Sequence, residues 1–399
     1  MYSLAGYESM LADDVRVRAY LDAIARVVRP GDVVVEIGTG VGYFAVAACR
    51  AGAARVYAIE SSDAVRLGPA VAAANGCADR ISFVHGSSER TSLPERGDVL
   101  IEDLRGVLPL NGSRFETLAD ARRRLLHPGA RRVPRADTLW AAPARFPAVL
   151  RENLLDGSFT PHGIDVSELR RYTRNGWHRA RALPDDLLGP PRRWAEIALE
   201  SMDDRRVEGE ADWTLEQPGR CDGWCVWFDS ELADGVSLRN SPGEPPAIYG
   251  QAFFPLEQPL MVASGDQLRL RIGAVRSEDD FEWHWESTHA RNGEEARWRQ
   301  SSLAGRLLDM TELRATALDA RPVPGLQTEV YATILAAVDG RRTIAEIARA
   351  LAHRHPRHFP TEFEAARFIS RRLQSIARDD ALQGDATALG TARRAERLD

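Results

Sequence analysis

Residues 1–140 alternate short β-rich runs with helical patterns, an order that is typical of a parallel α/β sheet. The first run, at 32–36, is apolar apart from its ends and is followed by glycines, as a buried strand would be. The remaining strands are expected at 55–59, 81–84 and 98–101, and helices at 14–28, 45–50, 117–126 and in an alanine-rich stretch reaching Asn75. His127-Pro128-Gly129 then gives a stop signal for the last helix.

From about 138 to 300, helical periodicity mostly gives way to short alternating runs that are separated by turn clusters. Such runs lie at 224–228, 251–254, 267–272 and 281–285. This pattern predicts antiparallel strands in a sandwich or a barrel. A more helical and proline-rich stretch at about 150–205 interrupts it, and we interpret that stretch as an insertion.

Helical periodicity returns from about residue 323. Thr343 with Glu346, and Thr361 with Glu364, have the spacing of capping boxes, and each pair opens an apolar-periodic stretch. We therefore expect a small independent helical module at 323–383. The polar, alanine-rich tail at 384–399 is predicted to be disordered.

Composition excludes several kinds of chemistry. The chain has 399 residues, with 52 lysines and arginines against 58 acidic residues, and reading the sequence shows that all 52 are arginine. Without lysine, the chain cannot form a Schiff base, build a phosphate-binding P-loop or act as a protein kinase. Since basic and acidic side chains are interspersed and the net charge is −6, no nucleic-acid partner is indicated.

The remaining composition points to a cytoplasmic protein. The first residues are acidic where a secretory signal would be basic, and no apolar run approaches the roughly 18 residues of a membrane helix. The four cysteines are too scattered for a disulfide framework. Cys221 and Cys225 lack a matching second pair, so we expect no metal.

The glycine-rich segment after the first strand carries the clearest chemical signal. Glu36 is followed by glycines at alternate positions, Gly38, Gly40 and Gly42, which allow a ligand to approach the backbone closely. Glu60 ends the next strand, 20 residues after Gly40, where a carboxylate can accept both ribose hydroxyls. A pyrophosphate fingerprint would need a different glycine spacing, and Glu36 would repel a phosphate. The pattern resembles motif I of class I S-adenosylmethionine (SAM) methyltransferases.

Further segments resemble the protein arginine methyltransferases. The segment from Tyr7 to Tyr20 is similar to the N-terminal helix of that family, and 224–229, 240–246 and 264–266 follow its barrel in order. The segment 163–167 is similar to the point where the family's dimerisation arm leaves the barrel. The resemblance implies an α/β + β fold, with a Rossmann-like SAM-binding domain at 1–137 and an antiparallel β-barrel at 138–305 that carries a helical arm. The arm could pair two copies of the chain as a homodimer.

The resemblance also implies a SAM site. In it, Arg16 would pair with the cofactor's carboxylate and Met10 would lie near the sulfonium. Glu60 would hold the ribose hydroxyls, and the three glycines would line the methionine and the ribose. Ser88 and Glu89 would contact the adenine.

Glu102 resembles the first glutamate of the loop in which the family grips a guanidinium with two carboxylates, and Asp103 is an adjacent candidate. The second glutamate is absent: its place falls near Leu110 or Asn111. A guanidinium, with a pKa above about 12, needs two anions, whereas one carboxylate suffices for an amine. We therefore expect an N-methyltransferase whose acceptor is an amine of a peptide or protein.

The segment 339–351 resembles the core of PqqD-type domains, winged-helix modules that hold the leader peptides of ribosomally made natural products. The resemblance implies a peptide substrate that is delivered by its leader, as for daptide-type methyltransferases that dimethylate a terminal amine. Two alternatives stay open. One is a protein arginine methyltransferase in which another acid replaces the missing glutamate, and the other is a non-catalytic protein that binds SAM or a partner.

Overall fold

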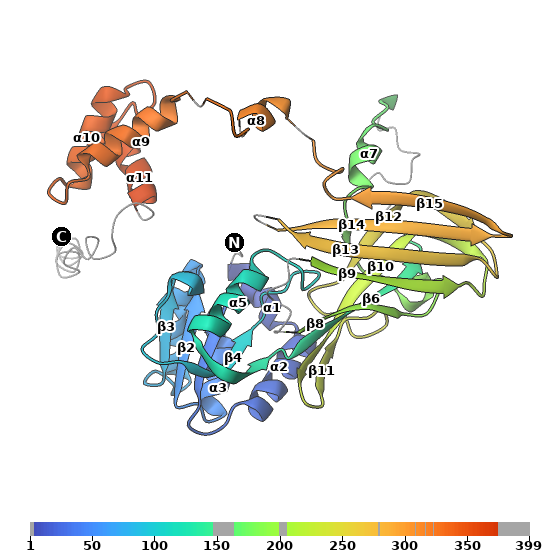
Figure 1. Ribbon diagram of the computed structural model, residues 1–399. Helices are drawn as coiled ribbons and strands as arrows, with labels where there is room; N and C mark the ends of the chain where they lie inside the picture. The colour runs from blue at the N-terminus through green and yellow to red at the C-terminus, as the bar shows by residue number, and fades with distance from the viewer. Residues whose placement is uncertain are drawn as a thin grey trace. The chain divides into compact units, whose positions relative to one another are not determined.

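The computed structural model describes residues 4–146, 163–198, 206–277, 280–307, 309–315, 317–321 and 323–373. The chain divides into two compact units, Met1–Leu307 and Leu308–Asp399, shown in Figure 1. The tail that is expected to be disordered, 384–399, lies outside the described residues. None of the described helices is both long and apolar enough to span a membrane.

The first unit begins with a five-stranded parallel sheet in the order β3-β2-β1-β4-β5, which confirms the predicted parallel α/β arrangement. The order reverses between β1 and β4, and ligands of open α/β sheets bind at such a switch point. Its strands are β1 (Val33–Ile37), β2 (Arg55–Glu60), β3 (Ile81–His85), β4 (Gly97–Glu102) and β5 (Leu126–Val133). The α-helices are α1 (Leu4–Leu11), α2 (Asp14–Val27), α3 (Tyr43–Arg50), α4 (Gly68–Ala74) and α5 (Arg114–Arg124), with short 3-10 helices η1 (Asp63–Leu67) and η2 (Ser88–Arg90).

The strand β5 was not predicted from the sequence. The expected helix at 117–126 ends at Arg124, and the residues that form its stop signal, His127-Pro128-Gly129, are part of β5. The pairing of β4 with β5 contains a register shift, and the middle of β5 is exposed. Because β5 is an edge strand, it tolerates the proline and the glycine that would interrupt a central strand.

Two antiparallel sheets follow, and they confirm the predicted strand-rich region (Figure 1). One sheet has the order β7-β12-β10-β6-β8, with β11 also paired to β10, and the other has the order β15-β14-β13-β9. Large aromatic side chains from both sheets, among them Trp213, Trp224, Phe254 and Trp283, pack in one buried core. The strands are β6 (Ala136–Ala144), β7 (His178–Ala180), β8 (Arg192–Ala198), β9 (Arg206–Thr214), β10 (Gly219–Ala233), β11 (Val236–Arg239), β12 (Gln251–Val262), β13 (Gln267–Arg276), β14 (Phe281–Arg291) and β15 (Glu294–Ser301).

The expected helical insertion at about 150–205 is wrong in its second half. Strands β7 and β8 lie within it, and they pair with β12 and β6 of the larger sheet. In β8, Trp194 and Ile197 are buried while the arginines beside them are exposed, so only part of this strand shows the alternation of a half-buried strand. The described residues of this stretch contain one α-helix, α7 (Leu169–Thr173), and one 3-10 helix, η4 (Pro184–Asp186); the segments 147–162 and 199–205 lie outside them.

The second unit is helical over its described residues, with α8 (Met310–Ala315), α9 (Leu326–Ala337), α10 (Ile344–Arg354) and α11 (Glu362–Leu373). Both predicted capping boxes are confirmed, since Thr343 and Glu346 exchange hydrogen bonds, as do Thr361 and Glu364. The last three helices enclose their own apolar core. The described part of this unit contains no strand, so the winged-helix form stays a prediction.

Candidate active site

The loop after β1 has the backbone geometry that its glycines allow. Gly38, Gly40 and Gly42 have φ values of +79°, +56° and +86°, which are unfavourable for other residues. A side chain at Gly40 would also place its Cβ 2.5 Å from the ring of Tyr7 in α1. The loop therefore lies directly against α1 at the switch point of the sheet.

Glu60, at the end of β2, is joined to this loop by hydrogen bonds. Its Oε2 accepts a bond from the backbone nitrogen of Gly40 at 3.0 Å, and its Oε1 accepts one from that of Ser62 at 2.7 Å. The side chain of Tyr7 is bonded to Ser62 at 3.0 Å. A carboxylate next to a close-approach loop suits the ribose hydroxyls of a nucleoside, so these donors and acceptors fit SAM.

The other predicted cofactor residues lie on two sides of the loop. Met10, in α1, accepts a hydrogen bond on its backbone oxygen from Nη1 of Arg16 at 3.1 Å. Ser88 is buried in η2, after β3, and the neighbouring carboxylate of Glu89 accepts a bond from Thr117 at 3.0 Å. The structure brings Gly40 and Glu60 together, and also Met10 and Arg16. Ser88 and Glu89 follow β3, and Gly86, two residues before Ser88, donates its backbone nitrogen to the backbone oxygen of Glu60 at 2.9 Å.

Glu36, within β1, is buried beneath the glycine loop. Burial raises its pKa to about 7, although the hydroxyl of Thr39 partly offsets the increase by donating a hydrogen bond of 2.6 Å. The protonated form of Glu36 is therefore favoured at neutral pH more than that of an ordinary carboxyl group.

Asp103, directly after β4, lies among two arginines and a tyrosine. Its Oδ2 accepts a bond from Nε of Arg16 at 2.6 Å, and its Oδ1 accepts bonds from Nε and Nη2 of Arg105, both at 3.0 Å. The hydroxyl of Tyr249 is 2.9 Å from Oδ1 and 2.7 Å from Oδ2. Burial alone would raise the pKa of Asp103, but the charges of the two arginines hold it far below its usual range. Asp103 is therefore ionised at neutral pH.

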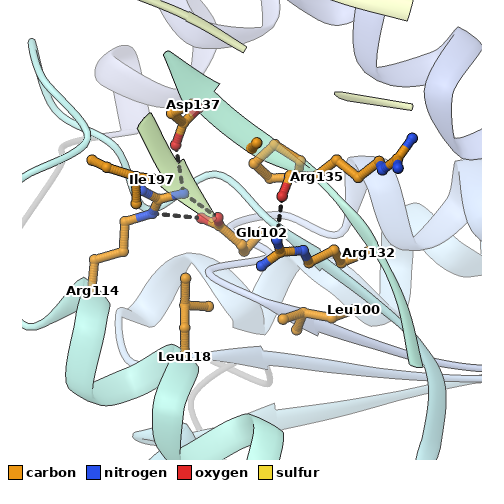
Figure 2. Close-up of a pocket in the computed structure, with 10 residues that line it drawn as sticks. Leu100, Glu102, Arg114, Leu118, Arg132, Arg135, Asp137 and Ile197 are labelled. Carbon is orange, nitrogen blue, oxygen red and sulfur yellow. Dashed lines mark hydrogen bonds and ion pairs between the residues drawn. The ribbon is translucent and has the colours of Figure 1, made fainter. Parts of the chain in front are cut away.

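Glu102, the last residue of β4, is bound by a different arginine from those that bind Asp103. Nη2 of Arg114 donates to its Oε1 at 2.7 Å and lies 2.9 Å from the carboxylate of Asp137 in β6 (Figure 2). Asp137 also receives a bond of 3.0 Å from Arg105. The cavity beside these groups has a volume of about 10 Å³, room for one water molecule at most. As the structure stands, Glu102 is closed to a substrate.

Six charged side chains thus form one buried chain of alternating sign, which runs Arg16–Asp103–Arg105–Asp137–Arg114–Glu102. Sequence reasoning missed Arg105, Arg114, Asp137 and Tyr249. Asp137 has no local signal, because its partners come from the loop after β4 and from α5. Among the described residues, no group of three or more His, Cys, Asp and Glu side chains could hold a metal ion.

Comparisons with known proteins agree with this geometry. Residues 18–103 match a family model described as ribosomal protein L11 methyltransferase (PrmA). The protein arginine N-methyltransferase PRMT10 of Arabidopsis thaliana is 26% identical over 311 residues, covering 68% of this chain and 80% of its own. The arginine N(omega)-methyltransferase of Streptomyces achromogenes subsp. streptozoticus is 28% identical over 66% of this chain and 74% of its own.

Among solved structures, the Trypanosoma brucei PRMT1 enzyme–prozyme complex with AdoHcy has a TM-score of 0.67 at 20% identity, covering 74% of this chain and 96% of the other. The first unit therefore has the fold of the protein arginine methyltransferases. The chain is a SAM-dependent methyltransferase, and SAM is its cofactor. The non-catalytic alternative is set aside.

Proposed function

We propose that this enzyme transfers a methyl group from SAM to a guanidinium nitrogen of an arginine in a protein or peptide. The curated relatives above are named as arginine methyltransferases, which supports this acceptor over the amine expected from the sequence. The observation that carries the proposal is the pair of carboxylates Glu102 and Asp137, which converge on one guanidinium nitrogen, Nη2 of Arg114. This end of the site has the paired, charge-assisted hydrogen bonds that a guanidinium requires.

Different residues of the site bind the cofactor and orient the acceptor. SAM supplies the methyl group, and the acceptor nitrogen must present an uncharged lone pair to it in line. Arg16 would hold the cofactor's carboxylate, and Glu60 its ribose. Because the pKa of Asp103 is held so low, Asp103 orients cationic groups and does not take up their protons.

Asp137 is our candidate for the second carboxylate that the sequence motif lacks. It binds the same Nη2 atom of Arg114 as Glu102 does, so the two acids converge on one guanidinium nitrogen. A substrate guanidinium could use this pair only if Arg114 moved aside. Arginine methylation by this pair would therefore need a local rearrangement in α5.

An amine of a peptide is the second candidate acceptor, and one observation favours it. Each of the three carboxylates Glu102, Asp103 and Asp137 is already ion-paired with an arginine of the chain, which leaves no anion for a second guanidinium without movement. An amine needs fewer anions. On this alternative, the PqqD-like second unit would bind a leader peptide, as in daptide-type natural-product biosynthesis in the cytoplasm. A homodimer through the part of the predicted arm that precedes β7 is proposed for either acceptor.

The two acceptors are separated by incubation with SAM that carries a deuterated methyl group. One peptide has a blocked amino terminus and a single arginine, and another has a free amino terminus and neither arginine nor lysine. The proposal expects label on the first peptide only, read by mass spectrometry. Label on the second peptide alone would overturn it in favour of the amine. The peptides are separated from the enzyme before analysis, because its own 52 arginines and its amino terminus are also potential acceptors.

A further inference from the structure

Tyr249 connects the antiparallel sheets to the cofactor side of the parallel sheet. It lies between β11 and β12, is 6% exposed, and packs edge-to-face on Phe228 with ring centroids 5.1 Å apart. The neighbouring backbone nitrogen of Ile248 donates to Asp13, which caps the start of α2, at 2.7 Å. The loop that carries Tyr249 is thus anchored at α2, and the position of the ring is well defined.

The hydroxyl of Tyr249 bridges both carboxylate oxygens of Asp103, at 2.9 and 2.7 Å. Burial and the charge of Asp103 raise the pKa of Tyr249 well above its usual value, so the hydroxyl stays a donor. A bond to both oxygens resists rotation of the carboxylate about its own axis. Asp103 is thereby held with Oδ1 toward Arg105 and Oδ2 toward Arg16.

Asp103 in turn orients the guanidinium of Arg16. The bond from Nε at 2.6 Å and the bond from Nη1 to the backbone oxygen of Met10 at 3.1 Å fix its plane. Nη2 makes no hydrogen bond with the described residues, and 8% of the side chain is exposed. A planar guanidinium held by two of its nitrogens presents the third in a defined direction, which suits an incoming carboxylate.

We propose that Tyr249 is a positioning residue for the cofactor, which acts through Asp103 on Arg16 and so on the binding of the methionine carboxylate. A side chain of the antiparallel sheets therefore contributes to SAM affinity without contacting SAM. The inference concerns cofactor binding alone and does not depend on which nitrogen is methylated.

The test compares two ligands in Tyr249→Phe, by calorimetric titration without any acceptor. S-adenosylhomocysteine carries the carboxylate, whereas methylthioadenosine lacks it. We expect the Kd for S-adenosylhomocysteine to rise about 5- to 10-fold, the size of effect that one lost hydrogen bond gives, and the Kd for methylthioadenosine to stay unchanged. Equal weakening for both ligands, or none for either, would overturn the proposal.

Tyr57→Phe is the matched control. Its hydroxyl also donates to a carboxylate, that of Glu95 at 3.0 Å, but Glu95 precedes β4, whereas Asp103 follows that strand. Both ligands should bind the Tyr57→Phe variant as tightly as they bind the wild type. Asp103→Asn should show the same selective loss, and its folding is checked first by urea denaturation because it removes one charge of the network. Adding Tyr249→Phe to Asp103→Asn should cause little further loss of affinity for S-adenosylhomocysteine, since Tyr249 acts on Arg16 only through Asp103.

Discussion

The cofactor side and the acceptor side of this site are built in different ways. On the cofactor side, Gly38, Gly40 and Glu60 lie at the ends of two paired strands, β1 and β2, and backbone nitrogens of the glycine loop donate the hydrogen bonds that join them. On the acceptor side, the buried charge network draws on the segment after β4, α5 and β6, and it reaches Arg16 of α2 on the cofactor side. The cofactor side depends on backbone geometry, and the acceptor side depends on a balance of side-chain charges.

Because the two sides are built differently, different substitutions are expected to disrupt them. A glycine loop fails when a side chain forces its backbone out of a left-handed conformation. A buried charge network fails when one member is removed, because its partner then remains as an uncompensated charge in a poorly polarisable interior. Three arginines and three carboxylates balance here, so each single removal leaves a net charge.

The largest effect is expected from Arg114→Met. It leaves Glu102 and Asp137 buried without their shared partner, so we expect a loss of about 3–5 kcal/mol in the free energy of unfolding. Urea denaturation followed by tryptophan fluorescence measures it, because all nine tryptophans lie in the first unit. Arg131→Met is the control: it removes one ion pair, with Asp32, and one hydrogen bond to the backbone oxygen of Val27, the arginine is 28% exposed, and the loss should be roughly 1 kcal/mol. Equal losses would contradict the network account.

On the cofactor side, the prediction concerns how the free energy of unfolding depends on pH through the carboxyl group of Glu36. Its pKa of about 7 lies above the unfolded value of 4.5, so its contribution to stability is fully present below pH 4.5 and is lost as pH rises through 7. In the absence of SAM, wild type should lose roughly 3 kcal/mol more than Glu36→Gln between pH 4.5 and 8, since the amide stays neutral. Parallel pH profiles for the two proteins would show that Glu36 titrates normally.

The smallest effect is expected from Gly40→Ala. At φ +56°, with Tyr7 in contact, it should lower stability by about 2 kcal/mol and weaken S-adenosylhomocysteine binding at least tenfold. Gly76→Ala has a similar φ of +68° but nothing within 4 Å, so it should lose about 1 kcal/mol and bind normally. If both variants bound the ligand like wild type, the close approach at Gly40 would be unimportant for the cofactor.

Most of the features that depend on short stretches of sequence could be predicted. Four parallel strands, α2 and both capping boxes follow from periodicity and from short-range donors, and all are present. The strands β5, β7 and β8 were missed because edge strands carry prolines, glycines and arginines that break the alternating pattern. The partners of Glu102 and Asp103 could not be predicted, since Arg114 and Tyr249 reach them only through the fold.

The most direct test of the proposed activity is a competition within one peptide that carries both a free amino terminus and a single arginine. After incubation with enzyme and labelled SAM, tandem mass spectrometry assigns each methyl group to a nitrogen. The account predicts label on the guanidinium. Label confined to the terminal amine would contradict arginine as the acceptor.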